Sequence, residues 1–542
     1  SAALWTVYHS IDSEVGDIFQ QYQTTRYVDR EIPHIPVKAD GLNGTYEVLS
    51  TTHWLPYAWS INNVAFAEIA HTSLSYWQAG RANEAFRLFK SAILDGMYLG
   101  RSPGNVGQIS FYDAARGETY RDFGDPVGIY SRALVQGLFG ISPDLLNGRV
   151  IIRPGLPRDW NFAEFTAPYL EFNFRRKNKT DYYLLKNKFA VKSELILRLP
   201  VTHEKIKSVK INGKTASWTI LENIEFPLVE ITCGNAEQPE IKIEWEGNQL
   251  KPSVAKTTGK RDGFVKLLQR EMSWWQPTEA ETRKQDHSFA KNTLLPDFLK
   301  EKSEFIQINI DSVLNASVTD IFKNKYLSPR SPYTTLQTPW QGVGEWCKPL
   351  LTYEIDDTGL RRSTRNQTFT TPMGLPFRIP DGKNNIAFTT LWDNYPDSLS
   401  VTLSGRAQHA VLLMAGTTNP MQSGFVNGTV TVSYKDGTSE TLQLINPDTW
   451  CTIEQDYYTD GQAFRINTPR PYRVAFKSGI VSSDIGNALN IDSMEVYGRV
   501  IDGGAGVILN IPLDKNKELQ SLKLKSLANE VIIGLMAVTL VK

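Results

Sequence analysis

Apolar residues recur at intervals of three and four through much of the first 147 residues, and this spacing predicts amphipathic helices. One helix should end at Gly80, and its apolar face consists of Val64, Ala67, Ala70, Leu74 and Trp77. The next helix should carry on one face Ala85, Phe89 and Ile93. Another should start at Asp125-Pro126 and stop at Gly140, and an earlier helix should span about 13–25. Helices joined by long polar loops indicate an array of α/α hairpins.

From Arg149 onward the pattern changes to short apolar runs punctuated by Gly, Asn and Pro, which is typical of an antiparallel β-sandwich. The runs before residue 250 are 149–154, 169–175, 182–185, 194–199, 206–211, 228–232 and 240–245. Beyond residue 301 we expect strands at 401–403, 410–413, 429–434, 441–444, 507–511 and 532–541, with a hairpin turn at 435–437.

These patterns predict a multidomain α plus β protein. Its parts are a helical region over 1–147, a β-sandwich over 148–250, a linker over 251–300 that is polar and rich in Lys and Glu, and a second antiparallel, jelly-roll-like sandwich over 301–542. A chain of 542 residues is long enough for three or four domains of ordinary size.

Composition and charge exclude several classes of protein. The 58 basic residues balance the 58 acidic ones, and no basic run with interleaved aromatic residues indicates a nucleic-acid partner. The three cysteines are widely spaced and fit buried free thiols, not a disulfide framework or a metal site. The seven histidines lack metal-ligand spacing, and no apolar run is long enough for a membrane span. We therefore expect no metal and no cofactor.

Several phrases carry a resemblance to a known family. They are HSIDSEVGDIFQQYQTTRYVDR (9–30), WLPYAWSINN (54–63), YRDFGD (120–125), RPGLPRDW (153–160) and the C-terminal stretch 503–540. Together they resemble six-hairpin glycosidases, and in particular a large, poorly characterised family from polysaccharide-degrading gut Bacteroidetes. Such proteins join an (α/α)6 toroid to a β-sandwich.

The resemblance implies that residues 1–147 are the C-terminal part of a toroid. A full toroid needs twelve helices, and this stretch supplies five or six. Because Ser1 opens the chain without Met or a signal peptide, we expect a processed end and an N-terminal portion of the same precursor that completes the toroid. From the resemblance alone we also expect export to the periplasm or the cell surface.

Glycoside hydrolysis needs a protonated carboxyl group at the leaving oxygen and a second carboxylate that activates water or attacks the sugar. The resemblance implies an inverting mechanism and a base just before the last toroid helix. Asp122 is then the first candidate base and Glu118 the second, while Asp12 is the candidate acid, with Glu14 beside it. The acid could also lie upstream of Ser1. The two acidic clusters as a whole comprise Asp12, Glu14 and Asp17, and Asp113, Glu118, Asp122 and Asp125.

Each acid also has a structural interpretation. Asp12 and Glu14 could complement the dipole of the helix that they precede. Asp125 stands before Pro126 as a helix N-cap would. Asp122 could pair with its neighbour Arg121, and Glu118 could be a solvated charge.

Candidate substrate-binding residues are the aromatic Trp54, Tyr57 and Trp59, whose rings could stack on sugar faces or could belong to the core. Further candidate ligands for hydroxyl or carboxylate groups are His9, His53, Arg26, Arg30 and Arg121. Trp392 and Tyr395 in the last domain could bind carbohydrate or brace one domain against another.

The sequence thus predicts a glycoside hydrolase acting on a plant or host polysaccharide or oligosaccharide through two carboxyl groups. Two alternatives stay open. One is a non-catalytic glycan-binding or scaffold protein. The other is a polysaccharide lyase that uses the pair Tyr8-His9.

Overall fold

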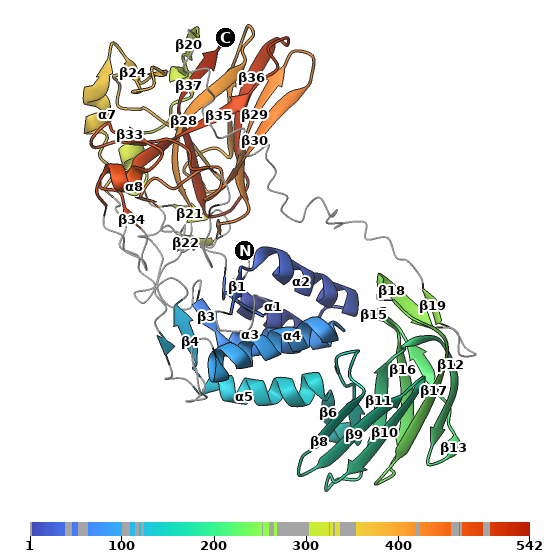
Figure 1. Cartoon of the computed structure of the whole chain (residues 1–542). Coiled ribbons are helices and arrows are strands. Elements are labelled where there is room, and N and C mark those ends of the chain that lie inside the picture. The colour runs from blue at the N-terminus through green and yellow to red at the C-terminus, as the bar shows by residue number, and fades with distance from the viewer. Residues whose placement is uncertain are drawn as a thin grey trace.

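In the computed structural model of the chain, helices prevail up to residue 138 and strands prevail from residue 141 onward (Figure 1). The residues that the structure describes are 3–37, 46–52, 63–99, 109–113, 119–120, 124–251, 253–259, 265–267, 303–324, 326–328, 331–335, 354–418, 422–456, 466, 469–491 and 499–542.

The described part of the N-terminal region forms α1 (Leu4–Asp12), α2 (Ile18–Glu31), α3 (Phe66–Gln78), α4 (Ala82–Ile93) and α5 (Asp125–Arg132). π-Helical turns over Leu94–Tyr98 and Ala133–Leu138 continue α4 and α5. The helices predicted from the apolar spacing are therefore confirmed, although the earliest begins at residue 18 and a further helix precedes it.

Helix α3 lies at the centre of this region and packs against α1, α2, α4 and α5. Its predicted apolar residues Ala70, Leu74 and Trp77 are buried. Two short antiparallel ladders complete the region, β1 (His34–Pro36) with β2 (Glu47–Leu49), and β3 (Asn63–Ala65) with β4 (Phe111–Asp113) and β5 (Thr119–Tyr120). Five helices do not make a complete toroid, so the toroid stays a prediction.

The first β-sandwich follows α5 directly (Figure 1, green). One sheet has the order β13-β12-β17-β10-β9-β8, and the other has the order β14-β16-β11-β7-β6. The strand bounds are β6 (Ile141–Asp144), β7 (Arg149–Ile152), β8 (Phe162–Thr166), β9 (Leu170–Lys177), β10 (Thr180–Asn187), β11 (Glu194–Pro200), β12 (His203–Ile211), β13 (Lys214–Thr215), β14 (Thr219–Leu221), β16 (Leu228–Gly234) and β17 (Glu240–Gln249). All seven runs predicted before residue 250 are strands. The pairing differs from the prediction at one place, because β7 runs parallel to β11.

The helical region and this sandwich share one hydrophobic core, which extends without a break from Leu4 to Trp245. Trp77 sits at the junction, where its indole N–H donates to the carbonyl oxygen of Gly155 at 2.9 Å. A Cβ atom on either Gly137 or Gly155 would come within 2.1 Å of the Trp77 ring. The two glycines therefore allow the backbone to contact both sides of the tryptophan.

Part of the predicted linker forms strands of a separate three-stranded sheet, of order β15-β18-β19. β18 (Ser253–Gly259) pairs with β15 (Asn223–Glu225) and with β19 (Val265–Leu267). The residues from 268 to 300 lie outside the described part of the chain.

The C-terminal region contains a second pair of facing sheets. The larger has the order β20-β37-β28-β35-β32-β33, with β26 also on β37, and the smaller has the order β27-β36-β29-β30. The bounds in the larger sheet are β20 (Phe305–Ile308), β26 (Ala387–Thr390), β28 (His409–Thr418), β32 (Arg473–Ala475), β33 (Val481–Ser482), β35 (Ala505–Pro512) and β37 (Val531–Val541). Those in the smaller sheet are β27 (Ser398–Thr402), β29 (Val426–Tyr434), β30 (Ser439–Ile445) and β36 (Leu519–Ser526). The six strands predicted here and the turn between β29 and β30 are confirmed.

The larger sheet is covered on both faces, because a second core packs on the side away from the smaller sheet. Trp392 and Tyr395 are partly buried against that second core, and the Tyr395 hydroxyl oxygen accepts a hydrogen bond from the Asn324 amide at 2.7 Å. The contacts described for Trp392 and Tyr395 lie within this domain, and their predicted roles stay predictions. Cys233 and Cys451 are buried free thiols, as expected.

Candidate active site

A short ladder brings the two candidate loops of the N-terminal region together. β3 follows the aromatic stretch 53–62, and β4 and β5 flank the acidic stretch that begins at residue 113. Asn63 lies opposite Asp113 in the ladder, and β4 pairs with β5 at Phe111 and Tyr120. The ends of both loops are therefore side by side, immediately before the first turns of α3 and α5.

The loop residues themselves lie outside the described residues. This group comprises the candidate binding residues His53, Trp54, Tyr57, Trp59 and Arg121 and the candidate acids Glu118 and Asp122. Their roles stay predictions.

Glu68, in the first turn of α3, is the most unusual carboxyl group near this ladder. Its Oε2 atom is fully buried and makes no hydrogen bond. Burial, and after it the negative charge of Asp125, raise the pKa of Glu68 to about 8. Glu68 is consequently protonated at neutral pH and can donate a proton.

Asp125 is not the helix N-cap that the sequence suggested. Gly124 occupies the N-cap of α5, and Asp125 is the first helical residue, with Pro126 after it. The Asp125 side chain is exposed, and no cap hydrogen bond holds it. Its negative charge acts on the carboxyl group of Glu68.

Tyr8 of α1 lies beside the same two acids. Its ring stacks on His71 of α3, with ring centroids 4.2 Å apart, and His9 approaches the edge of His71 at 6.0 Å. Burial first, and then the charges of Glu68 and Asp125, raise the pKa of Tyr8 to about 12. The phenol of Tyr8 therefore stays protonated at neutral pH and serves as a hydrogen-bond donor.

Asp12, the predicted acid, is held in an ion pair farther along the same helices. Arg132 of α5 donates to both carboxylate oxygens, at 2.6 and 3.1 Å, and the Gln78 amide donates at 3.1 Å. Burial alone would raise the pKa of Asp12, but these hydrogen bonds and the charge of Arg132 outweigh it and lower the pKa. An ionised, bidentate carboxylate is suited to positioning Arg132 and not to donating a proton.

His71 contacts both Tyr8 and Arg132, the partner of Asp12. Its Nε2 atom lies 3.1 Å from Nη1 of Arg132, and because a guanidinium only donates, Nε2 is the acceptor. Burial and the charge of Arg132 lower the pKa of His71, which favours the neutral ring.

The other predicted residues lie apart from this cluster. Glu14 is exposed in the turn between α1 and α2, with a φ of 55°. The side chain of Asp17 forms a capping box with Gln20 at the start of α2. Arg30 pairs with Glu31 at 2.6 Å, and Arg26 pairs with Asp29 at 3.2 Å. These contacts are structural, and none of them reaches Glu68 or Asp125.

Sequence reasoning missed Glu68. The helix that contains it was predicted from its apolar residues, and Glu68 is one of its polar positions. The available signal was a carboxylate in the first turn of a largely apolar helix, directly after the aromatic stretch 53–62. In the described part of the chain no three His, Cys, Asp or Glu side chains are grouped as metal ligands. None of the helices there is long and apolar enough to span a membrane.

No family model and no curated protein sequence matches this chain. Among solved structures it is similar to an α-L-rhamnosidase from Dictyoglumus thermophilum, at 16% identity and a TM-score of 0.19 over 24% of this chain and 16% of that one. A GH127 β-L-arabinofuranosidase from Geobacillus stearothermophilus T6 matches at 11% identity and a TM-score of 0.23 over 44% and 40%. A cycloalternan-forming enzyme from Listeria monocytogenes matches at 8% identity and a TM-score of 0.15 over 71% and 22%.

These neighbours are glycoside hydrolases, and the chain spans less than half the length of each. At such TM-scores the similarity neither assigns this chain to a family nor identifies a substrate.

Proposed function

We propose that this chain carries a glycoside hydrolase site at the first turns of α3 and α5, with Glu68 as the general acid. The observation that carries the proposal is a buried Glu68 carboxyl group, with no hydrogen bond to Oε2 from the described residues, within the electrostatic reach of the exposed Asp125 side chain. Glycoside hydrolysis requires one carboxyl group that is held in its protonated form and a second carboxyl group near it.

The base comes from α5 or from the loop before it. Asp125 is the candidate whose position the structure describes. Asp122, the base predicted from the sequence, lies three residues upstream of it. An exposed carboxylate can hold the attacking water while Glu68 protonates the leaving oxygen. The predicted inverting course is part of this proposal, and it would require a carboxyl separation of about 6.5–9.5 Å.

The other members of the cluster position these groups. Tyr8 offers a phenolic hydroxyl beside both acids, and its stacking on His71 fixes its ring. Asp12 orients Arg132, whose guanidinium in turn bonds His71. The aromatic residues Trp54, Tyr57 and Trp59 would stack on the sugar rings of a plant or host glycan.

A variant of Glu68 tests the proposal against a panel of plant and host polysaccharides. Glu68→Gln keeps the shape of the side chain but removes the acidic proton, so kcat should fall by about 10²- to 10⁴-fold. Substrate binding should survive. Glu164→Gln, an exposed residue of β8, is the matched control and should leave kcat unchanged. Asp122→Asn and Asp125→Asn should identify the base by the larger loss.

The same assay distinguishes the alternatives. New reducing ends without new ultraviolet absorbance indicate hydrolysis, whereas absorbance from an unsaturated product indicates a lyase. The raised pKa of Tyr8 disfavours the phenolate that a lyase base needs. Glycan binding without turnover in the unaltered protein would leave only the scaffold interpretation, and full activity of Glu68→Gln would remove Glu68 from the mechanism.

The toroid of the proposed enzyme would continue along α1 and α2. A mostly apolar groove of about 780 Å³ lies between them, lined in part by Val7, Ile11, Val15 and Tyr27, and Val15 is 88% exposed. We propose that further helical hairpins of the same precursor pack in this groove. In a longer chain with such hairpins the amides of α1 and α2 should exchange hydrogen more slowly, and unchanged exchange would contradict this assembly.

A further inference from the structure

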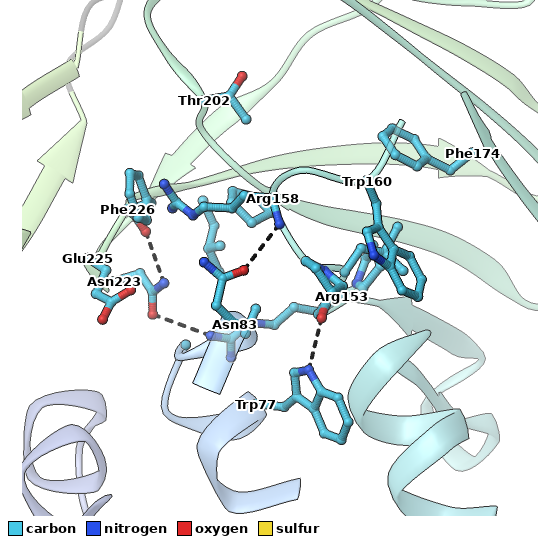
Figure 2. Close-up of a pocket in the computed structure, with 18 of the residues that line it drawn as sticks. Trp77, Asn83, Arg153, Arg158, Trp160, Phe174, Thr202, Asn223, Glu225 and Phe226 are labelled. Atoms are coloured by element: carbon cyan, nitrogen blue, oxygen red, sulfur yellow. Dashed lines mark hydrogen bonds between the residues drawn. The ribbon is translucent and has the colours of Figure 1, made fainter. Parts of the chain in front are cut away.

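A second cavity lies at the opposite end of α3, where the helical region meets the first sandwich (Figure 2). It has a volume of about 100 Å³, and a single water needs roughly 10–15 Å³ by the same measure. The cavity therefore has room for several waters or for one small ligand. Trp77 borders it nine residues after Glu68, roughly 14 Å along the helix at 1.5 Å per residue. This cavity is thus separate from the candidate active site.

The lining combines guanidinium groups, amides and aromatic rings. Arg153 and Arg158 line the cavity from the segment between β7 and β8, and Figure 2 shows Asn223 and Phe226 beside the ends of their side chains. Trp160 and Phe174 supply aromatic surface at one side. The wall thus offers planar cationic donors next to ring faces.

Neither arginine has a carboxylate partner among the described residues. Nη2 of Arg153 makes only a long hydrogen bond to the Asn223 amide oxygen, at 3.4 Å. The guanidinium of Arg158 lies over the Phe226 ring, and in the hydrogen bond to Asn83 that Figure 2 shows, the donor is the backbone N–H of Arg158 and the acceptor is the Asn83 amide oxygen. Burial lowers the pKa of both arginines to about 10; the charge of Arg198 adds to this effect at Arg153, and the charges of Glu225 and Glu84 only partly offset it at Arg158.

Two neighbouring arginines do have the carboxylate partners that Arg153 and Arg158 lack among the described residues. Arg176, also in the wall, is bound by both oxygens of Asp181, at 2.6 and 2.9 Å. Arg81 is bound by Asp29 at 2.7 Å. Desolvated guanidinium groups in this part of the fold are thus paired with carboxylates, except where the cavity opens.

Glu225 does not replace the missing partner. It lines the cavity and its charge acts on Arg158, but no ion pair joins the two side chains, and its Oε1 atom instead accepts from the Tyr22 hydroxyl at 3.5 Å. Burial, followed by the charge of Glu84, raises the pKa of Glu225, so its own negative charge is weakened.

We propose that this cavity binds the oxyanion group of a small ligand, with Arg153 and Arg158 as its partners. Guanidinium groups bind carboxylate, sulfate and phosphate oxygens in a bidentate manner. The ring of Trp160, which also lines the cavity, suits the apolar face of a sugar, so the ligand that fits both features is an acidic sugar such as a uronic acid. A free inorganic anion offers the same charged group without the ring.

Calorimetric titration of the whole chain with glucuronate, glucose, inorganic sulfate and inorganic phosphate tests this site. Glucuronate should bind and glucose should not. Arg158→Gln and Arg153→Gln should each raise the Kd for glucuronate at least tenfold. Arg149→Gln is the matched control, because that arginine is exposed on β7 and pairs with Asp144, and its Kd should equal that of the unaltered protein.

The other possible outcomes of the titration also support or overturn the proposal. Sulfate or phosphate binding as tightly as glucuronate supports the oxyanion site with a free anion as its ligand. If no anion binds at millimolar concentration, or if both arginine variants bind as the unaltered protein does, the proposal is overturned. Equal binding of glucose would overturn the charged recognition. If Arg153→Gln fails to fold, the Arg158→Gln result stands alone, because the side chain of Arg158 makes no ion pair within the described residues.

Discussion

Glu68 and Asp12 are carboxylic acids on neighbouring helices, and their surroundings move their pKa values in opposite directions. Glu68 is buried without a hydrogen bond on Oε2 and beside another acid, so its neutral form is favoured. Asp12 receives three hydrogen bonds from Arg132 and Gln78, so its ionised form is favoured. The role of each acid follows from these contacts and not from the type of side chain.

The raised pKa of Glu68 makes folding stability dependent on pH. Between the pKa of an unfolded glutamate, about 4.5, and the folded value of about 8, the folded protein holds the extra proton. This contribution to stability is fully present below the lower value and is lost as pH rises through the upper one. The free energy of unfolding should therefore decline across this window by at most about 1.4 kcal/mol per pH unit from this group.

Denaturant unfolding of Glu68→Gln at several pH values checks this expectation. The glutamine carries no titrating proton, so the variant should gain stability relative to the unaltered protein as pH rises from 5 to 8. Parallel pH curves for the two proteins would show that Glu68 is not protonated in the folded state.

The site was only partly predictable from single residues. The aromatic and acidic stretches were recognisable because unusual side chains cluster in them, and the ladder between Asn63 and Asp113 brings their ends together. Glu68 was not recognisable because its properties depend on its burial in the packed helices and on Asp125, which comes from another helix. No local pattern in the sequence encodes that packing.

At the scale of helices and strands, the local pattern was a good guide to the elements and a poor guide to their partners. Alternating residues identified β9 and β17, and continuous apolar runs identified β28 and β37, which are buried on both faces. The parallel pairing of β7 with β11 was missed because β8, β9 and β10, which lie between these two strands in the sequence, belong to the other sheet, so the pairing is a long-range relation.

The contact between α3 and the junction gives a prediction about Gly137. A Cβ there would lie 2.1 Å from Cε3 of Trp77, so Gly137→Ala should destabilise the protein by about 1–3 kcal/mol through overpacking. Combining it with Trp77→Ala should cost less than the sum of the two changes. Gly128→Ala on α5 is the control: nothing lies within 4 Å of its Cβ, so a gain of about 0.5–1 kcal/mol is expected. Chemical denaturation of the four variants measures these differences, and additive costs would contradict the contact.

Asp29 connects α2 to the two helices that follow. Its carboxylate accepts from Arg81 at 2.7 Å and from the Tyr76 hydroxyl at 2.5 Å, and the Arg81 side chain is only 3% exposed. Asp29→Asn should leave that buried guanidinium with only the more distant Glu84, at 3.9 Å, as an ionic partner, at a cost of about 3–5 kcal/mol.

Urea unfolding of Asp29→Asn, compared with Asp144→Asn, measures this cost. Asp144 pairs with the exposed Arg149, so its loss should change stability little. If the two variants lose similar stability, the buried pair does not hold the helices together.

At the scale of the molecule, the chain has separate hydrophobic cores. One extends from Leu4 to Trp245 and unites the helices with the first sandwich. The cores of the C-terminal sheets draw on residues beyond 305 and share no residue with it. The sequence predicted the change from helix to strand at residue 149. It did not show that the helices and the strands on either side of this point share a single core.

Separate cores should unfold as separate cooperative units, so differential scanning calorimetry of the whole chain should resolve two transitions. Gly137→Ala should lower only one of them. Leu412→Ala, which empties space in the core between the C-terminal sheets, should lower only the other, by about 2–5 kcal/mol of unfolding free energy. If both variants shift one common transition, the cores are energetically coupled, and the helices with the first sandwich are not an independent unit.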